Sequence, residues 1–219
     1  FAELVTTAAA SVIELPPGMG AREAALTEPA ATALHAIHLA ARALVRPLPE
    51  CSVLVLGGGA IGMLATLLLE HYGVRHLRVA ETNGLRRVSL ARACRATVYD
   101  PAATPSGDGV ADLVIDAVGA ATTRNAALAA VKPGGVVMHI GLMDWASEID
   151  MRRLTLAEIA LLGTYTYSTC DLRAAVHALH EGAFGDLAWV EERPLAQGAA
   201  AFRDLHERRS AAAKIVLRP

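Results

Sequence analysis

Residues 52–62 carry the pattern that most constrains this chain, an apolar run that leads into a G-x-G-x-x-G turn. In such a turn Gly57 permits the tight bend, Gly59 lets a phosphate approach the backbone, and Gly62 lets the next helix pack closely on the strand. That helix then offers unpaired N–H groups and a positive dipole end to an anion. Because a strand precedes the turn and a helix follows it, the pattern predicts dinucleotide binding, with a purely structural glycine turn as the alternative.

Glu81 strengthens this prediction because it ends a second apolar segment, nineteen residues after Gly62. A carboxylate at this distance accepts hydrogen bonds from the adenosine ribose hydroxyls and repels a 2′-phosphate. Glu81 therefore favours NAD over NADP. Arg86 and Arg87 keep NADP open, since adjacent arginines can accommodate a phosphate.

Apolar runs and helical segments alternate after the turn, which predicts βαβ crossovers and a parallel sheet covered on both faces. The expected fold class is therefore α/β, with a doubly wound six-stranded parallel sheet of the Rossmann type. The expected strands are 52–56, 76–80, 97–99, 112–116, 135–140 and 161–166, and the expected helices are 60–71, 85–94, 121–130 and 153–160.

The flanking segments are less regular. Phe1 to Leu15 is expected to form short β segments, and residues 22–45 a long helix kinked near Pro29. Later in the chain we expect helices at 171–181 and 195–208 and a short strand at 214–217. The run Glu191-Glu192-Arg193 is interpreted as surface charge.

Composition limits the classes of partner. The 219 residues are 53% hydrophobic and carry a formal net charge of −2, so a sizeable core is expected and neither nucleic acid nor a membrane is an expected partner. The three cysteines lack C-x-x-C spacing, which favours a reducing, cytoplasmic setting and argues against a self-contained cysteine zinc site. Because the chain starts at Phe1 rather than at Met, we expect upstream sequence.

Several segments together resemble the C-terminal two-thirds of zinc-type alcohol and polyol dehydrogenases, in the medium-chain dehydrogenase/reductase family. The pair Glu28-Pro29 resembles the branch that acts on sorbitol-like polyols, threonine and related secondary alcohols. The matching segments are Phe1-Ala-Glu3, Glu23-Ala-Ala-Leu-Thr-Glu-Pro29, the glycine turn, Asp112-Leu-Val-Ile-Asp-Ala-Val-Gly119, Lys132-Pro-Gly-Gly135, Ile140-Gly141, Leu162-Gly-Thr-Tyr165 and Lys214-Ile-Val-Leu217.

The resemblance implies a domain organisation and a metal. Residues 1–30 would be the remnant of an incomplete GroES-like β catalytic domain, 31–170 the dinucleotide-binding domain, and 171–219 C-terminal helices and a strand that return toward the catalytic domain. Glu28 would lie at the catalytic zinc, as a ligand or a near neighbour. The alternative is a solvated helix carboxylate, and Glu28 alone cannot hold zinc, which normally needs three protein ligands.

The resemblance also places cofactor contacts. Ala60 and Ile61 follow the glycine turn beneath the nicotinamide or pyrophosphate, and Arg86 lies by the adenosine. The remaining implied contacts are Ala117 and Val118 at the cofactor edge, Ile140 and Leu142 around a glycine that faces the carboxamide, Thr164 through its backbone, and Lys214 at the pyrophosphate.

The resulting hypothesis is an NAD-dependent oxidoreductase that transfers hydride between a secondary alcohol or polyol and nicotinamide. Zinc would act as Lewis acid, held mostly by upstream residues. Two alternatives stay open: a zinc-free quinone- or enoyl-type reductase, and a non-catalytic nucleotide-binding homologue. The resemblance further implies a homodimer or homotetramer that joins through the last strand of the sheet, around residues 161–166.

Overall fold

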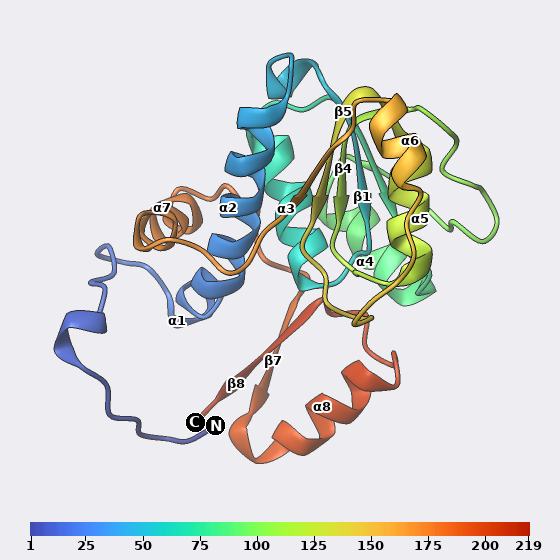
Figure 1. Cartoon of the computed structure of the whole chain (residues 1–219). Helices are drawn as coiled ribbons and strands as arrows, with labels where there is room; N and C mark the ends of the chain where they lie inside the picture. The colour runs from blue at the N-terminus through green and yellow to red at the C-terminus, as the bar shows by residue number, and fades with distance from the viewer.

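Six parallel strands form one sheet at the centre of the molecule, in a computed structural model that describes residues 1–219 (Figure 1). Their order across the sheet is β3-β2-β1-β4-β5-β6, so the chain moves outward in one direction from β1 and then returns to build the other half. This confirms the predicted doubly wound sheet. The strands are β1 (Ser52–Leu56), β2 (His76–Ala80), β3 (Thr97–Tyr99), β4 (Ala111–Asp116), β5 (Val131–His139) and β6 (Ala160–Gly163).

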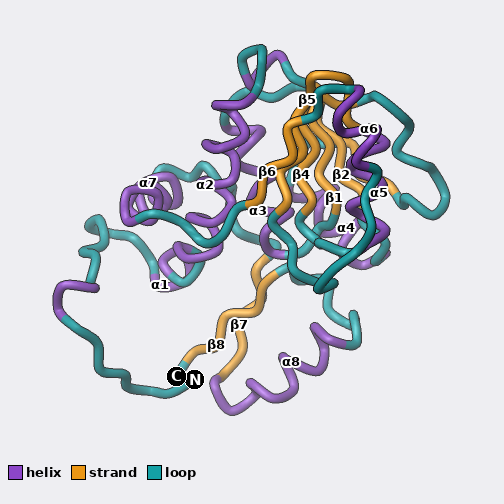
Figure 2. The backbone as a smooth tube through the Cα atoms, in the orientation of Figure 1, coloured by secondary structure: helices purple, strands orange, loops and turns teal.

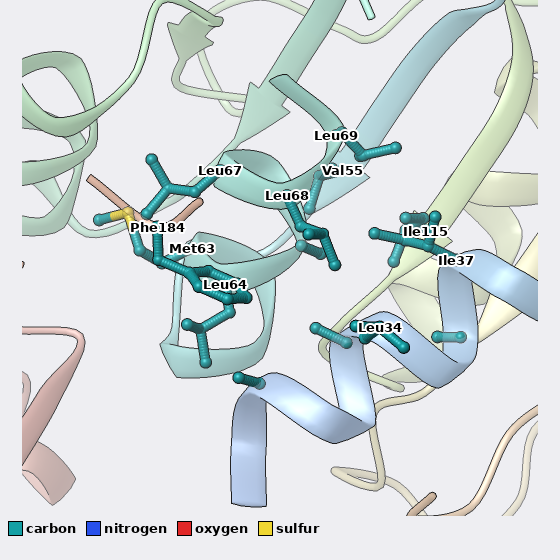
Figure 3. Close-up of a cluster of buried hydrophobic side chains, with 14 of the residues drawn as sticks. Leu34, Ile37, Val55, Met63, Leu64, Leu67, Leu68, Leu69, Ile115 and Phe184 are labelled. Atoms are coloured by element: carbon teal, nitrogen blue, oxygen red, sulfur yellow. The ribbon is translucent and has the colours of Figure 1, made fainter. Parts of the chain in front are cut away.

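Helices cover both faces of this sheet because the strands carry apolar side chains on both. Along β1, Val53 and Val55 belong to one buried cluster, whereas Leu54 and Leu56 belong to another. The first cluster joins β1 to α2 (Thr27–Ala43) and α3 (Ala60–His71), and Figure 3 shows some of its side chains. The second cluster lies under α5 (Ala121–Ala130) and α6 (Met151–Leu156), while α4 (Gly84–Ala93) follows β2.

The N-terminal segment differs from the predicted one. Residues 1–15 contain a single 3-10 turn at Ala9–Ser11 and no strand, so the expected short β segments are wrong. These residues are almost all exposed and have no neighbouring strand to supply ladder hydrogen bonds. The expected long helix is divided into two helices, α1 (Ala21–Ala24) and α2, because a turn at residues 25 and 26 interrupts it before Thr27. Pro29 lies in the first turn of α2, where a missing N–H costs little.

The C-terminal part has two sections with different surroundings. Helix α7 (Thr169–His180) packs on α2, and Phe184 after it is 1% exposed within the main cluster. Beyond it, β7 (Val190–Pro194) pairs in parallel with β8 (Lys214–Arg218), connected by α8 (Gly198–His206). We call residues 190–218 the arm, which extends below the main sheet (Figures 1 and 2). The ring of Phe1 lies 5.6 Å from the ring of Phe202 on α8. The predicted surface run 191–193 is therefore part of a strand.

Candidate functional site

The carboxyl ends of the strands meet at one edge of the sheet, and the glycine turn lies there. Gly57 has φ +93°, and a Cβ at this position would lie 2.5 Å from Cγ2 of Val118. A Cβ on Gly62 would lie 1.8 Å from the carbonyl oxygen of Gly57. Because no side chain fits at either position, both glycines are required for the turn itself.

Gly59 lies in the same turn but has a different environment. A Cβ built there meets no atom within 4 Å. Gly59 is the N-cap of α3, no side chain caps that helix end, and no acidic residue stands in its first turn. The N–H groups of this helix end and its positive dipole are therefore directed at open space, which is the arrangement that binds phosphate.

The carboxylate of Glu81 is fixed beside the turn by backbone donors. Glu81 is 6% exposed, and its Oε2 accepts the N–H of Gly58 at 2.7 Å while its Oε1 accepts the N–H of Asn83 at 2.7 Å. Asn83 in turn caps α4 by accepting the N–H groups of Leu85 and Arg86. The acid at the end of β2 thus joins the phosphate-binding turn to the start of α4.

Arg86 and Arg87, the two candidates for a phosphate neighbour, have different environments. Nη1 of Arg87 donates to the carbonyls of Glu81 and Thr82 and lies 3.0 Å from Oδ2 of Asp100, so its charge is paired. Arg86 has no carboxylate partner, and its buried Nε has no hydrogen-bond partner. Of the two, only Arg86 lacks a carboxylate partner.

Asp116, at the end of β4, was not among the predicted site residues but organises this edge. It is fully buried, and its Oδ1 accepts the N–H groups of Val118 at 3.1 Å and Gly119 at 2.9 Å. Its Oδ2 accepts the hydroxyl of Thr123. An acid that closes an apolar strand, as Asp116 does after Ile115, was the available signal. By holding this loop, Asp116 fixes the position of Val118 against the glycine turn.

The loops after β4 and β5 approach each other through two glycines. A Cβ on Gly119 would lie 1.9 Å from the carbonyl oxygen of Gly141, so the two backbones touch. Arg124 of α5 links the two loops, because its Nη2 donates to the carbonyl of Gly119 in the first loop and to that of Asp144 in the second. Its Nε donates to Nε2 of His139 at 2.9 Å. Arg124 and His139 also line a cavity of about 390 Å³ on this side of the sheet.

The structure brings most of the predicted cofactor residues together at this edge. Ala117 and Val118 follow β4, and Ile140, which is 7% exposed, follows β5. Leu142, in contrast, is 80% exposed. Thr164 follows β6, where its N–H donates to the carbonyl of His139 and its buried hydroxyl has no partner. Ala60 and Ile61 begin α3.

Two predicted residues lie outside the main sheet. Lys214 opens β8 in the arm, opposite Val190. Glu28 is exposed in the first turn of α2, and burial together with the charge of Glu28 raises the pKa of Tyr167. No group of three or more His, Cys, Asp or Glu side chains is placed to hold a metal ion. The residues present therefore do not form a zinc site, and Glu28 stays a predicted neighbour of one.

No helix combines the length and the apolar character needed to cross a membrane.

Known proteins resemble the chain over most of its length. It is 27% identical to L-galactonate-5-dehydrogenase of Escherichia coli, covering 83% of this chain and 54% of that protein. It is 24% identical to D-xylulose reductase A of Aspergillus oryzae, covering 89% and 54%. The chain thus spans about half the length of the curated relatives it matches.

Among solved structures, acetophenone reductase of Geotrichum candidum in complex with NAD matches with a TM-score of 0.83 at 25% identity, covering 94% of this chain and 58% of that one. These matches confirm the resemblance to polyol and alcohol dehydrogenases. The model of the family described as glucose dehydrogenase C-terminus matches residues 21–211. That match covers the glycine turn, the whole six-stranded sheet and most of the arm, and the chain belongs to this family.

Proposed function

We propose that this chain is the cofactor-binding part of an NAD-dependent oxidoreductase, which transfers hydride between a secondary alcohol or polyol and nicotinamide. One observation carries the proposal. Neighbouring atoms leave no space for a Cβ at Gly57 or Gly62, whereas Gly59 faces open space at the uncapped end of α3. A pyrophosphate fits this opening by charge and by hydrogen bonding. The named relatives act on D-xylulose, L-galactonate and acetophenone, which supports a carbonyl or alcohol substrate.

The residues of this chain would hold and orient the cofactor, and the nicotinamide, when bound, would supply the hydride chemistry. The end of α3 would bind the pyrophosphate, and Glu81 would accept the ribose hydroxyls. The unpartnered hydroxyl of Thr164 and the backbone near Ile140 would position the carboxamide. Val118, pressed against Gly57, would form a wall of the site.

The environment of Glu81 supports NAD rather than NADP. Its carboxylate is held by the N–H groups of Gly58 and Asn83, and this rigidity keeps a negative charge where a 2′-phosphate would lie. Arg87 is already paired, which leaves Arg86 alone to attract such a phosphate. We therefore expect discrimination in favour of NAD, with Arg86 facing the adenosine ribose.

Zinc and the subunit arrangement are further parts of the proposal. Glu28 would contribute to a zinc site only together with ligands from outside these residues, so no chemical step is assigned to the metal.

A homodimer or homotetramer would form at β6, the edge strand of the sheet. Exposed apolar side chains support this choice, namely those of Leu142, Met143, Trp145, Leu161 and Tyr165.

The proposal is tested by titrating NADH into the protein and following fluorescence. Gly59→Asp places a carboxylate in the open space, so the fold should persist while NADH binds at least tenfold more weakly. Ala91→Asp adds the same charge at an exposed position of α4 and should change the affinity less than twofold. Equal NADH affinity in the parent and in Gly59→Asp would refute cofactor binding at the turn.

A further inference from the structure

A separate cavity of about 350 Å³ opens at the amino edge of the sheet, the edge opposite to the glycine turn. Its walls come from the first residues of β1, β2, β3 and β4 and from the residues just before β2, β3 and β4. The strand register places Ser52 opposite His76, and Arg78 opposite both Leu54 and Thr97. His76 and Arg78 therefore point to the same face of the sheet.

The cavity is lined by cationic groups without an acid. Arg75, Arg78 and Arg95 line it together with His76, and no lining residue is Asp or Glu. This concentration contrasts with the chain as a whole, which carries a formal net charge of −2. Like charges gathered around one cavity repel one another, and an anion bound between them relieves that repulsion.

Arg78 is held in place by groups that leave its charge uncompensated. Its Nη1 donates to the carbonyl of Ser106 at 2.9 Å, and its Cζ lies 4.6 Å from the centre of the Tyr99 ring. The hydroxyls of Tyr99 and Ser106 are 2.7 Å apart, which fixes that ring and loop together. A half-buried guanidinium is thus positioned without any carboxylate contact, and its remaining donors are unused.

The acids around this cavity are already engaged. The carboxylate of Glu70 accepts the N–H of Arg95 at 2.6 Å, and its second oxygen lies 3.9 Å from Nε of Arg95. The carboxylate of Asp112 accepts hydrogen bonds from Nζ of Lys132 at 2.9 Å and from the N–H of Ser52 at 2.8 Å. Its other oxygen lies 3.9 Å from Nε of Arg46. These acids compensate part of the charge on Arg95 and none on Arg75 or Arg78.

We propose that this cavity, formed by Arg75, His76, Arg78 and Arg95, binds the phosphate group of a small phosphomonoester. Planar guanidinium groups donate paired hydrogen bonds to phosphate oxygens, so three arginines around one cavity suit this ligand. The cavity volume lies at the lower end of the range for small-molecule sites, which fits a phosphate with a short organic group. The site is at the amino edge and is independent of the cofactor proposed at the carboxyl edge.

The test uses calorimetric titration with inorganic phosphate and with glycerol 3-phosphate at constant ionic strength. All proteins carry Gly59→Asp, which removes the competing anion site at the glycine turn whatever that turn binds. Arg75→Ala combined with Arg95→Ala should weaken both ligands at least tenfold. Arg78→Lys keeps the charge but loses the planar fork, and should weaken them several-fold. Arg92→Ala, an exposed arginine of α4, is the matched control and should change the affinity less than twofold.

Three results would overturn the proposal. The first is an absence of phosphate binding in the Gly59→Asp protein. The second is binding that the paired Arg75 and Arg95 substitutions weaken no more than Arg92→Ala does. The third is tighter binding of citrate than of either phosphate compound, which would identify the site as one for carboxylates. Because the titration is done without NADH, none of these results depends on the proposed function.

Discussion

The main sheet and the arm are both parallel sheets, but they are stabilised by different interactions. In each of β1 and β4 all residues but one are buried, whereas β8 has no buried residue and β7 has only Val190. The main sheet is covered on both faces by helices, as parallel sheets normally are. The arm has one short helix beside its two strands, and an isolated pair of strands is marginally stable in water.

Ion pairs replace burial in the arm. Arg193 lies 2.6 Å from Glu191 and 2.7 Å from Asp204, which joins β7 to α8. Arg218 pairs with Glu192, and Arg22 approaches Glu192 at 3.4 Å. Ion pairs at or near the surface contribute little and are screened by salt. The contrast teaches that the arm adds only Val190 and Ala213 to the buried residues of the main cluster, so substitutions in that cluster and on α8 should have very different costs.

The largest expected effect comes from comparing a phenylalanine of the main cluster with a phenylalanine of the arm. Phe184 is 1% exposed in the main cluster, so Phe184→Ala should lower the free energy of unfolding by roughly 3–5 kcal/mol. Phe202 on α8 is 60% exposed, and Phe202→Ala should cost less than about 1 kcal/mol. Urea denaturation of the two variants measures both values. Equal losses would mean that the arm and the core are one cooperative packing unit.

A second comparison lies within the glycine turn of the main sheet. Gly62→Ala forces a Cβ against the carbonyl of Gly57 and should cost about 2–3 kcal/mol, because the backbone must move. Gly59→Ala places its methyl in open space and should change stability by less than about 1 kcal/mol. Thermal denaturation distinguishes the two variants. If Gly62→Ala proved as stable as Gly59→Ala, the close contact between α3 and β1 would not be required by packing.

The third effect is the pH dependence of stability that comes from the contact between α7 and α2. Burial acts to raise the pKa of Asp171, but the hydroxyl and N–H of Ser168, with His35 and His38, lower it from 3.8 to about 2. Because the folded pKa is depressed, the stabilisation is complete above the unfolded pKa and is lost as pH falls from about 4 to 2. It amounts to about 2 kcal/mol.

Urea denaturation at several pH values measures this dependence. Asp171→Asn should reduce the loss of stability between pH 4 and pH 2, whereas Asp108→Asn, at an exposed loop position, should leave the loss unchanged. An identical acid dependence in the parent and in Asp171→Asn would exclude the contact between α7 and α2 as its source.

The same contrast explains what the sequence could predict. Strands of the main sheet are recognisable because their apolar runs are continuous, and the glycine spacing locates the carboxyl edge. The arm strand β7 was missed because Glu191, Glu192 and Arg193 lack the apolar alternation of a packed strand. Asp116 and Arg124 were missed as organisers of the site because their importance lies in contacts with loop backbone from separate strands. The ladder partners that residues 1–15 lack are likewise invisible in local sequence.

The smallest expected effect concerns the ion pairs of the arm and is seen by amide hydrogen exchange. Arg193→Ala removes the link between β7 and α8, so amides of β7 and β8 should exchange several-fold faster, whereas those of β1 and β4 should not change. High salt should produce the same pattern in the parent protein because it screens these pairs. Arg152→Ala, at an exposed position of α6, is the control and should leave the arm unchanged. Faster exchange throughout the main sheet in Arg193→Ala would show that the ion pairs also support the core, which would contradict the separation between the two sheets.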